Sequence, residues 1–543
     1  MQGAFLLLPL SMLIRFWQLY SLMLLVNVSS CQEKSNIRNQ AKHQKSQPIQ
    51  EYEIVAGKFS EQSILQLDTS IITPFTQKFP EFKVYRNALA RFYGNRAYKL
   101  AWFDQGGMVE QAWILYNRIL SMEENGVAMD IHYASNYTQT MAGLQQDSLS
   151  WQELMITSQY LHFAEKTIIG LPGKMLEQNE WFIPRKKTGF ADLLDQMIED
   201  DAEEATRQQF FQYDYLKKEL KRLAAIEKQG GWKPIDKIKK ILRRGDSSYI
   251  VVQIRKRLQK EGYSLADTLN PVIDDTLKEV ISDFQIRHGL IPDGSIGKAT
   301  LTAMNVPVGT RLEQIIVNME RCRWLPLTSH DTYLIVNIPA FKVDVYEADS
   351  LLFSLNAIVG KETDKTAIFK GYLNQIVFSP YWNVPQSILT KEIMPILHRD
   401  PGYLERNHME WHNGKLRQKP GPDNALGGVK FIFPNPFNIY LHDTPAKGLF
   451  EKEKRTFSHG CIRISEPARL AEHLLKTEAG WDIQHIYNAM YSTIEKTKTL
   501  EKRIPVYVVY LTAYVDKEKR LHFREDVYHR DLGILSMLVK KNN

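Results

Sequence analysis

Two histidines and a cysteine lie close together near the carboxyl-terminal end of the 543-residue chain. In HDTPAKGLFEKEKRTFSHGCIRIS, residues 442–465, His442 and His459 both precede Cys461. A cysteine attacks a carbonyl carbon as its thiolate, and a neighbouring histidine can accept the thiol proton. The residue types and their spacing therefore indicate covalent catalysis by a cysteine with a histidine base, which requires no metal and no organic cofactor.

Two other chemistries use the same residue types. His442, Asp443, His459 and Cys461 could bind zinc, but they lie on one strand and one turn and include no CxxC or HxxxH pair. A papain-like enzyme usually has its cysteine far upstream of its histidine, whereas here His442 comes first. Both alternatives fit the spacing less well than an acyl-transfer site.

The local pattern predicts how these side chains are positioned. In NIYLHD, strand alternation places Tyr440 and His442 on one face. A turn over 458–460 precedes Cys461, and a helix begins just beyond it with Ser465 as its N-cap. We therefore expect the cysteine at the end of a β segment, beside a glycine that permits close approach.

Strand-like alternation dominates the last third of the chain. Segments such as TYLIVNIPAFKVDVYE and IPVYVVYLTAYVD predict a mostly β catalytic domain over 331–516, followed by a C-terminal tail over 517–543. Between 385 and 428 the strand pattern lapses into helical pieces and loop. A long insert of this kind is often functional, so we interpret it as a lid. The predicted fold class is a multidomain α+β protein.

The preceding segments are mainly helical. Residues 81–245 predict a helical scaffold, 246–306 a compact unit of three short helices, and 307–330 a connecting helix. The unit over 246–306 resembles a bacterial peptidoglycan-binding repeat, in residues that include Leu258-Gln259, Phe284-Gln285, Gly289-Leu290, Asp293-Gly294, Gly297 and Thr300. A structural spacer without binding remains the alternative for this unit.

The amino terminus predicts export. Residues 1–30 read as a signal peptide, because the apolar run over 16–28 is shorter than the ~20 residues that a spanning helix needs. Val28-Ser29-Ser30-Cys31 resembles a lipobox, so we expect lipidation at Cys31 and a tether over 31–80. Ordinary secretion and an uncleaved anchor are the alternatives. Of the other two cysteines, Cys322 is expected to be a small buried residue and Cys461 a free thiol.

The overall charge gives little support for nucleic-acid binding. The net charge is +7, and the basic residues are interspersed with acids along the chain. No block of Lys or Arg forms a candidate patch. We expect no nucleic-acid partner.

The catalytic region resembles a known family. His442 and the run SHGCIR over 458–463 resemble the signature of YkuD-type L,D-transpeptidases. RWLP, VNIPAFKVDVYE, SPYWNVPQSI, KEIMPILHRDPGYL and RQKPGPDNALGGVKFIFPNPFNIYLHDTP resemble the larger YcbB-like branch, over roughly residues 85–535. That branch combines a helical scaffold, a peptidoglycan-binding domain and a lidded catalytic domain.

The resemblance implies a reaction and a set of residue roles. Such enzymes cleave the bond after the L-centre of meso-diaminopimelate at stem position 3 and transfer the acyl group to another stem, forming a 3→3 cross-link. The implied partners are stem peptides, carbapenem inhibitors and, through the lipid, a membrane of the cell envelope. The implied roles are Cys461 as nucleophile, His442 as general base, His459 and Gly460 at the oxyanion, and Ser458, Arg463, Tyr440 and Trp382 in substrate binding.

Two other functions fit the same residues. A hydrolase that uses water as acceptor would need the same nucleophile and base. A wall-binding lipoprotein with an inactive catalytic fold would need neither, and the intact His442 and Cys461 argue against it.

Overall fold

The computed structural model describes residues 63–120, 131–144, 148–166, 170–171, 173–184, 210–325, 331–348 and 350–539. The predicted signal peptide, Cys31 and the tether up to residue 62 lie outside these ranges. No helix within them is long and apolar enough to cross a membrane. The described residues form three large hydrophobic cores and one small one.

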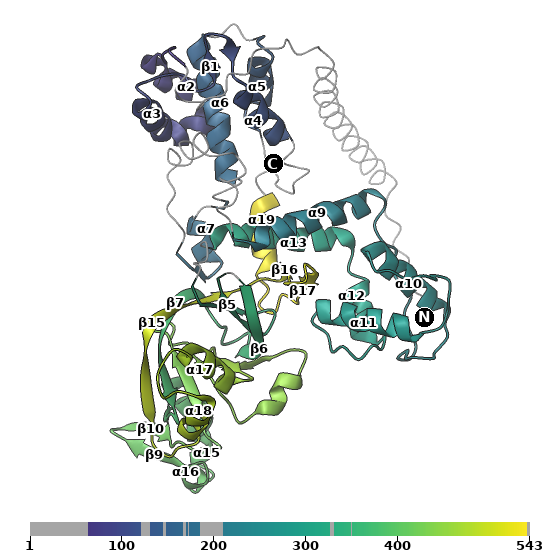
Figure 1. Ribbon diagram of the computed structural model, residues 1–543, viewed down its shortest axis with the longest axis vertical. Coiled ribbons are helices and arrows are strands. Elements are labelled where there is room, and N and C mark those ends of the chain that lie inside the picture. Colours follow the sequence, from purple (N-terminus) through teal and green to yellow (C-terminus); the bar gives the residue numbers. More distant parts are fainter. Residues whose placement is uncertain are drawn as a thin grey trace, which may run out of the picture. The chain divides into compact units, whose positions relative to one another are not determined.

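The first core belongs to a set of helices around the apolar helix α6 (Figure 1). The elements are η1 Thr69–Ile71, α2 Ile72–Lys78, η2 Pro80–Tyr85, α3 Arg86–Asn95, α4 Glu110–Leu120, α5 Ala134–Met141 and α6 Leu149–Ala164, with the short pair β1 Phe103–Asp104 and β2 Gly107–Met108. Every residue of α6 from Glu153 to His162 is buried. A helix that is buried on all sides forms the centre of a bundle.

The predicted tether over 31–80 is too long. Leu67, Ile72, Phe75 and Phe79 are buried in the first core, so the folded region has begun by residue 67. Phe75 packs against Phe82 and Trp151 with ring centroids 6.2 Å and 5.5 Å apart. Burial of these aromatic rings outweighs the polar character of the residues between them.

The unit predicted over 246–306 contains its three helices, α10 Tyr249–Glu261, α11 Asp275–Arg287 and α12 Lys298–Met304. Side chains of Ser248 and Asp274 cap α10 and α11 by accepting the amides of Ile250 and Leu277. The predicted apolar faces are confirmed, since these residues form a core of their own: Val251, Ile254, Leu258, Leu277, Ile281, Phe284, Leu301 and Met304.

Two long helices connect this unit to the β-rich domain. They are α9 Gln212–Lys228 and α13 Val308–Trp324, and both contribute to the largest core. Cys322 on α13 is free and fully buried, which confirms its predicted place. The shorter elements α7 Gly173–Gln178 and β3 Trp181–Phe182 join the same region, where β3 pairs in parallel with β7 Ile368–Phe378.

The β-rich domain is built on one ten-stranded sheet. The strand order is β11-β12-β14-β6-β5-β4-β15-β7-β3, with β13 beside β6, and β11 also pairs with β7. This second pairing closes the sheet into a barrel-like ring. The strands are β4 Tyr333–Asn337, β5 Lys342–Glu347, β6 Ser350–Gly360, β7 Ile368–Phe378, β11 Val429–Ile432, β12 Leu441–His442, β13 Thr456–Ser458, β14 Ile462–Ile464 and β15 Lys496–Val509.

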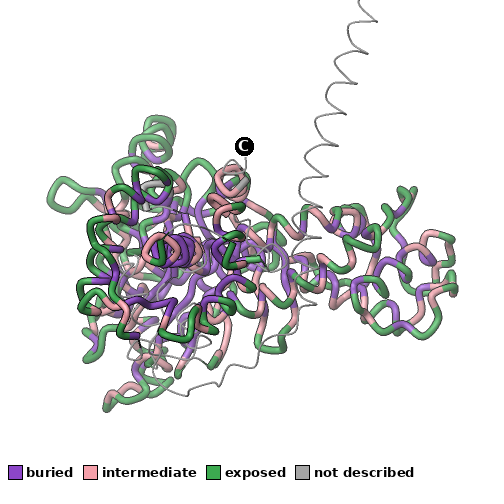
Figure 2. The backbone as a smooth tube through the Cα atoms, turned by 90° about the horizontal axis from the view of Figure 1, so that it is seen from above, coloured by how far each residue is buried: buried purple, intermediate pink, exposed green. Residues whose placement is uncertain are grey.

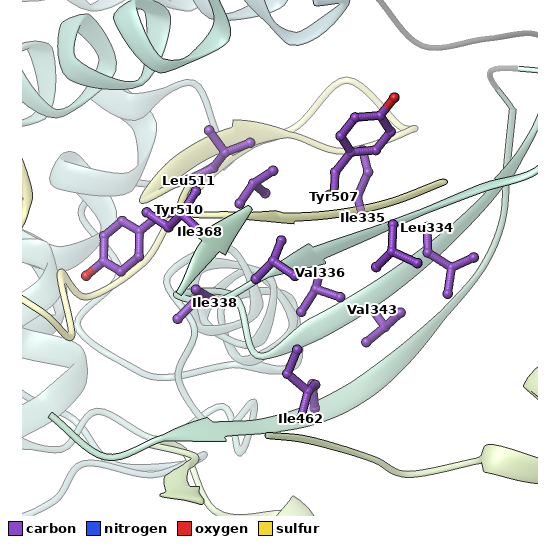
Figure 3. Close-up of a cluster of buried hydrophobic side chains, with 14 of the residues drawn as sticks. Leu334, Ile335, Val336, Ile338, Val343, Ile368, Ile462, Tyr507, Tyr510 and Leu511 are labelled. Atoms are coloured by element: carbon purple, nitrogen blue, oxygen red, sulfur yellow. The ribbon is translucent and has the colours of Figure 1, made fainter. Parts of the chain in front are cut away.

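The largest core lies within and beside this sheet. Figure 3 shows Leu334, Val336, Val343 and Ile462 among its apolar side chains. Buried and exposed positions follow one another closely along the backbone (Figure 2). Helices α17 Pro467–Leu475 and α18 Ile483–Met490 add buried side chains to this core. The predicted α+β class is therefore confirmed.

The predicted lid over 385–428 contains both helices and strands. Its helical pieces are α14 Gln386–Ile388, the π-helical turn η6 Leu389–Ile393, α15 Met394–Leu397 and α16 Tyr403–Arg406. A three-stranded sheet, β8 Trp382–Asn383, β10 Lys415–Gln418 and β9 Met409–His412, was not predicted. Leu389, Ile393 and Leu416 form a small separate core between the helical pieces and the strands of this insert.

The predicted C-terminal tail over 517–543 is wrong as far as residue 539. The chain forms the hairpin β16 Ala513–Val515 and β17 Leu521–Phe523, then α19 Asp531–Val539. Val527, Tyr528 and Ile534 are buried in the largest core. These contacts join residues distant in sequence, so the local pattern could not indicate them.

Candidate active site

The predicted site residues lie on two adjacent strands. β12 pairs in parallel with β14, so that Leu441 lies opposite Ile462 and His442 opposite Arg463. The amide of Ile462 donates to the carbonyl oxygen of Tyr440 at 3.1 Å. Leu441 and Ile462 are fully buried in the core. Strand alternation therefore leaves the neighbouring side chains together on the other face: Tyr440, His442, Cys461 and Arg463.

Cys461 is a free, half-buried thiol. Its Sγ donates to the carbonyl oxygen of Asn438 at 3.7 Å, and Asn438 has a left-handed backbone with φ of 55°. Burial raises the pKa of the Cys461 thiol, and hydrogen bonds from the backbone amide and hydroxyl of Tyr440 and the charge of Arg463 oppose that rise in pKa. Cys461 is therefore a protonated thiol near neutral pH.

The turn before Cys461 is held from inside. Ser458 is buried; its Oγ donates to the carbonyl oxygen of Cys461 at 2.5 Å and accepts the amide of Gly460 at 3.2 Å. Gly460 has φ of 106°, a region that favours glycine. Ser458 thus shapes the turn, and its position does not suit the predicted contact with substrate.

A second layer supports the same turn from behind. Thr366 Oγ1 donates to the carbonyl oxygen of Gly460 at 2.8 Å and accepts the amide of Gly360 at 2.9 Å. The hydroxyl of Tyr528 donates to the carbonyl oxygen of Gly360 at 2.6 Å. The segment predicted as a tail therefore helps to fix the turn that carries Cys461.

His442 is buried and held in one orientation. Its Nδ1 donates to the carbonyl oxygen of Asp443 at 2.5 Å, which assigns a proton to Nδ1 and makes Nε2 the candidate base. The backbone of Leu426 is a second hydrogen-bond partner of the ring, and within the described residues no hydrogen bond joins His442 to Cys461. Burial, reinforced by the charge of Arg463, lowers the pKa of His442 to about 3. The pKa is low because burial disfavours the imidazolium. His442 is neutral near neutral pH.

Asp443 holds the loop that contains Gly427 and Gly428. Its carboxylate accepts the amides of Gly428 at 2.9 Å and Thr444 at 2.7 Å, and it pairs with Lys447. Gly427 has φ of 60°, and a Cβ there would lie 2.4 Å from the Asp443 carboxyl group. Sequence reasoning treated Asp443 only as a possible zinc ligand, although the adjacent pair Gly427-Gly428 indicates close backbone approach.

His459 contacts the insert over 385–428. Its Nε2 lies 2.7 Å from Oε1 of Glu392 on η6. Since the imidazole meets Glu392 and the amide of Gly460 meets Ser458, neither group is free to hold an oxyanion in this conformation. No acceptor within the described residues meets the amide of Cys461, which is the remaining donor of this turn.

The two predicted aromatic residues occupy different places. Tyr440 lies beside His442, with ring centroids 5.6 Å apart at 58°, and burial raises the pKa of its hydroxyl. Trp382 is half-buried on β8 at the base of the lid, where it pairs with Gln418. Within the described residues, the structure records no hydrogen bond or ring contact between Trp382 and the four side chains on the shared face.

Helix α17 begins at Pro467 with Glu466 in the cap position. The predicted cap, Ser465, has another contact: its Oγ accepts the amide of Asn356 at 3.1 Å and so ties the end of β14 to β6. No group of three or more His, Cys, Asp or Glu side chains in the described ranges could hold a metal ion.

The comparisons with known proteins agree along the chain. The scaffold domain family matches residues 87–220, a family described as "Putative peptidoglycan binding domain" matches 247–304, and the L,D-transpeptidase catalytic domain family (YkuD) matches 331–506. A "Putative L,D-transpeptidase" of Haemophilus influenzae is 27% identical over 350 residues, which are 58% of this chain and 70% of that protein.

Two solved L,D-transpeptidase structures show weak similarity to this chain. The L,D-transpeptidase of Xylanimonas cellulosilytica shares 13% identity over 50% of this chain and 100% of its own, with a TM-score of 0.18. That of Stackebrandtia nassauensis shares 14% over 51% and 97%, with a TM-score of 0.23. These scores are too low to support an assignment, which rests on the three domain families and the Haemophilus relative. Residues 331–506 therefore match the L,D-transpeptidase catalytic domain, and matches to a scaffold domain and a peptidoglycan-binding domain precede it along the chain.

Proposed function

We propose that this protein is a cysteine L,D-transpeptidase that forms 3→3 cross-links between peptidoglycan stem peptides through a thioester on Cys461. The observation that supports this is the shared strand face, which gathers a free thiol, a neutral imidazole and a guanidinium. An amide is hard to cleave in one step, and a covalent intermediate divides the reaction into two easier ones.

In the first step, the sulfur of Cys461 bonds to the carbonyl carbon at the L-centre of diaminopimelate. The thiol proton passes to Nε2 of His442, and His442 then donates it to the nitrogen of D-Ala as the C–N bond breaks. In the second step, the amine of another stem attacks the thioester and loses a proton to His442. The proton returns to the sulfur, and the free thiol is restored.

The resting charges favour this order of events. Cys461 is a thiol and His442 a neutral imidazole, so the proton moves only as the sulfur attacks. The imidazolium then faces the oxyanion of the tetrahedral intermediate, while Arg463 supplies a fixed positive charge nearby. We assign the amide of Cys461 as an oxyanion donor, a kind of contact that contributes about 10²–10³ in rate.

The lid bears on the choice of acceptor. Glu392 and His459 connect η6 to the turn that carries Cys461. A lid that closes there excludes water from the thioester and favours transfer to an amine over hydrolysis.

The test uses purified tetrapeptide muropeptides, whose products are separated and identified by mass spectrometry. Wild type is expected to release D-Ala and form dimers linked between two diaminopimelate residues, and Cys461→Ala to form none. Release of D-Ala with tripeptides alone would identify a hydrolase. Dimers formed by Cys461→Ala would refute the proposed nucleophile.

The peptidoglycan-related domains indicate the cell envelope as the site of action. We propose that Cys31 carries a lipid that anchors the protein to an envelope membrane. Cys31→Ser is then expected to move the protein from the membrane fraction to the soluble periplasm. A wild-type protein that is soluble and has no lipid mass at its amino terminus would refute the anchor.

A further inference from the structure

A row of three basic side chains crosses the sheet beside Cys461. In the antiparallel pair β11–β12, Lys430 lies opposite His442, and in the parallel pair β12–β14, His442 lies opposite Arg463. Residues that are partners in a sheet register point to the same face, and neighbouring strands lie about 4.8 Å apart. Lys430, His442 and Arg463 therefore share the face that carries Cys461, with His442 in the middle.

The electrostatics agree with this placement. The positive charges of both Arg463 and Lys430 lower the pKa of His442, as they would from either side of its ring. Val429 and Phe431, the neighbours of Lys430, are fully buried on the opposite face. Because His442 is neutral, the row holds two cations separated by an uncharged imidazole.

Neither cation is neutralised by the described part of the chain. Arg463 makes no hydrogen bond or ion pair there, and its Nε is buried without a partner. Lys430 is half-buried, and burial lowers its pKa. Glu495 acts on Lys430 through its charge, but makes no ion pair with it and accepts the amide of Tyr381 at 2.8 Å.

Several buried arginines elsewhere in the described residues have partners. Arg255 pairs with Asp274, Arg257 with Glu261 and Arg321 with Asp531, at 2.6 to 2.7 Å, while Arg311 and Arg524 donate to backbone carbonyl oxygens. A cation taken out of water costs free energy unless an anion or acceptor meets it. Two such cations on the face of the nucleophile indicate that the anion comes with the substrate.

We propose that Lys430 and Arg463 bind a carboxylate of the donor stem peptide and thereby hold its scissile carbonyl at Cys461. This rests on the proposed function. The donor has two carboxylates near that bond, one on the side chain of diaminopimelate and one at the end of D-Ala. A planar guanidinium matches a carboxylate with two hydrogen bonds, and the lysine adds a compact positive charge.

The experiment compares three synthetic donors: the tetrapeptide stem, the same stem with the diaminopimelate side-chain carboxylate amidated, and the stem with the D-Ala carboxylate amidated. Thioester formation on Cys461 is followed by intact-protein mass spectrometry. For the wild type, we expect amidation of one of the two carboxylates to reduce kcat/KM by about 10–100-fold, the effect of losing hydrogen bonds to a charged group.

Lys430→Met should lower kcat/KM by a similar factor on the unmodified stem, chiefly through KM, and should lower it little further on the sensitive amidated donor. Lys430→Arg should restore most of the loss on the unmodified stem. Lys342→Met is the matched control, because Lys342 is a half-buried lysine on β5 of the same sheet. It should match the wild type on all three donors.

The outcomes separate the two proposals. If no donor acylates the wild type, the proposed function fails. If the wild type is acylated but tolerates both amidations, the carboxylate proposal is overturned, and this result does not depend on the folding of any variant. An equal loss for Lys430→Met on all three donors would also overturn it, since the lysine would then support the site without contacting a carboxylate.

Discussion

At the scale of single residues, the site is distinguished by a thiol and an imidazole that are both uncharged at rest. Burial disfavours the thiolate of Cys461 and the imidazolium of His442, and the nearby Arg463 further disfavours the imidazolium. A preformed thiolate–imidazolium pair, as in many cysteine enzymes, is therefore not the resting state. Reactivity must arise when the carbonyl of the donor arrives.

This resting state predicts an unusual dependence of rate on pH. Folding depresses the pKa of His442 to about 3 and raises that of Cys461, so the reactive neutral pair persists across the physiological range. Acylation of Cys461 by a carbapenem should change little between pH 5 and 8. The measurement is the initial rate of adduct formation. An acidic limb centred near pH 6.5, the usual histidine pKa, would contradict the buried neutral base.

Substitutions of the site residues should slow formation of the carbapenem adduct to different extents, according to the role of each residue. Cys461→Ala should abolish the carbapenem adduct, and His442→Ala should slow its formation by about 10²–10⁴-fold, the usual contribution of general acid–base catalysis. His459→Ala should cost less, because its imidazole faces Glu392. An adduct that persists in Cys461→Ala would show that another residue is acylated.

The sequence predicted part of this site from local pattern. Alternation placed Tyr440 and His442 on one face, and the structure agrees. Lys430 was missed because its place beside His442 depends on the register between β11 and β12, which no local pattern encodes. Glu392 was missed for the same reason, since its contact with His459 spans 67 residues.

At the scale of elements, the insert over 385–428 contacts the catalytic turn through an exposed hydrogen bond between His459 and Glu392. Glu392 on η6 meets Nε2 of His459 at 2.7 Å, and their side chains are 51% and 33% exposed. Solvent-exposed pairs of this kind contribute about 0.2–1 kcal/mol. Such a contact can bias a lid toward closure without locking it, as a lid that must open for each donor requires.

Glu392→Ala should therefore loosen the lid. Hydrogen exchange over η6 should accelerate, and a bulky thiol reagent should modify Cys461 about 2–5-fold faster, in line with a loss of up to about 1 kcal/mol. Glu405→Ala is the control, because Glu405 is an exposed acid on α16 of the same lid and makes no ion pair within the described residues. Equal effects of the two substitutions would exclude a specific latch.

Elements with a strong local signal were predicted well, and those fixed by distant partners were not. The helices α10 and α11 have side-chain caps, and α10, α11 and α12 have apolar residues that the sequence displays. The hairpin β16–β17 and helix α19 depend instead on contacts with residues far away in the sequence. Arg321 on α13 pairs with Asp531 on α19, and Asn318 Nδ2 donates to Thr512 Oγ1 at 2.7 Å. These contacts join residues about 200 positions apart, so the segment read as a tail.

At the scale of the whole molecule, the chain contains separate hydrophobic cores rather than one. The cores centred on α6, on α10 and α11, and on the large sheet share no residue. Regions with separate cores can open independently, and hydrogen exchange then reports a different stability for each. A perturbation confined to one core should leave exchange in the other cores unchanged.

Glu153 on α6 provides such a perturbation. Its buried carboxylate accepts the amides of Ala101 at 2.5 Å and Trp102 at 3.0 Å and the hydroxyl of Tyr93 at 2.8 Å. Burial nevertheless raises its pKa from 4.5 to about 7. In an unfolded chain it ionises near pH 4.5, so the folded state binds more protons between these values. Stability of this core therefore falls as pH rises from about 4.5 to about 7, by about 3 kcal/mol in all.

Protection of the Ala101 and Trp102 amides, corrected for intrinsic exchange, should accordingly fall between pH 5 and pH 8. In Glu153→Gln, which cannot ionise, the fall should be absent whatever the absolute stability of the variant. Amides of α10 and α11 serve as the internal control and should show the same protection in both proteins, because their core is separate. A fall of equal size in Glu153→Gln would place the titrating group elsewhere in the first core, and a parallel fall in α10 would show that the cores open together.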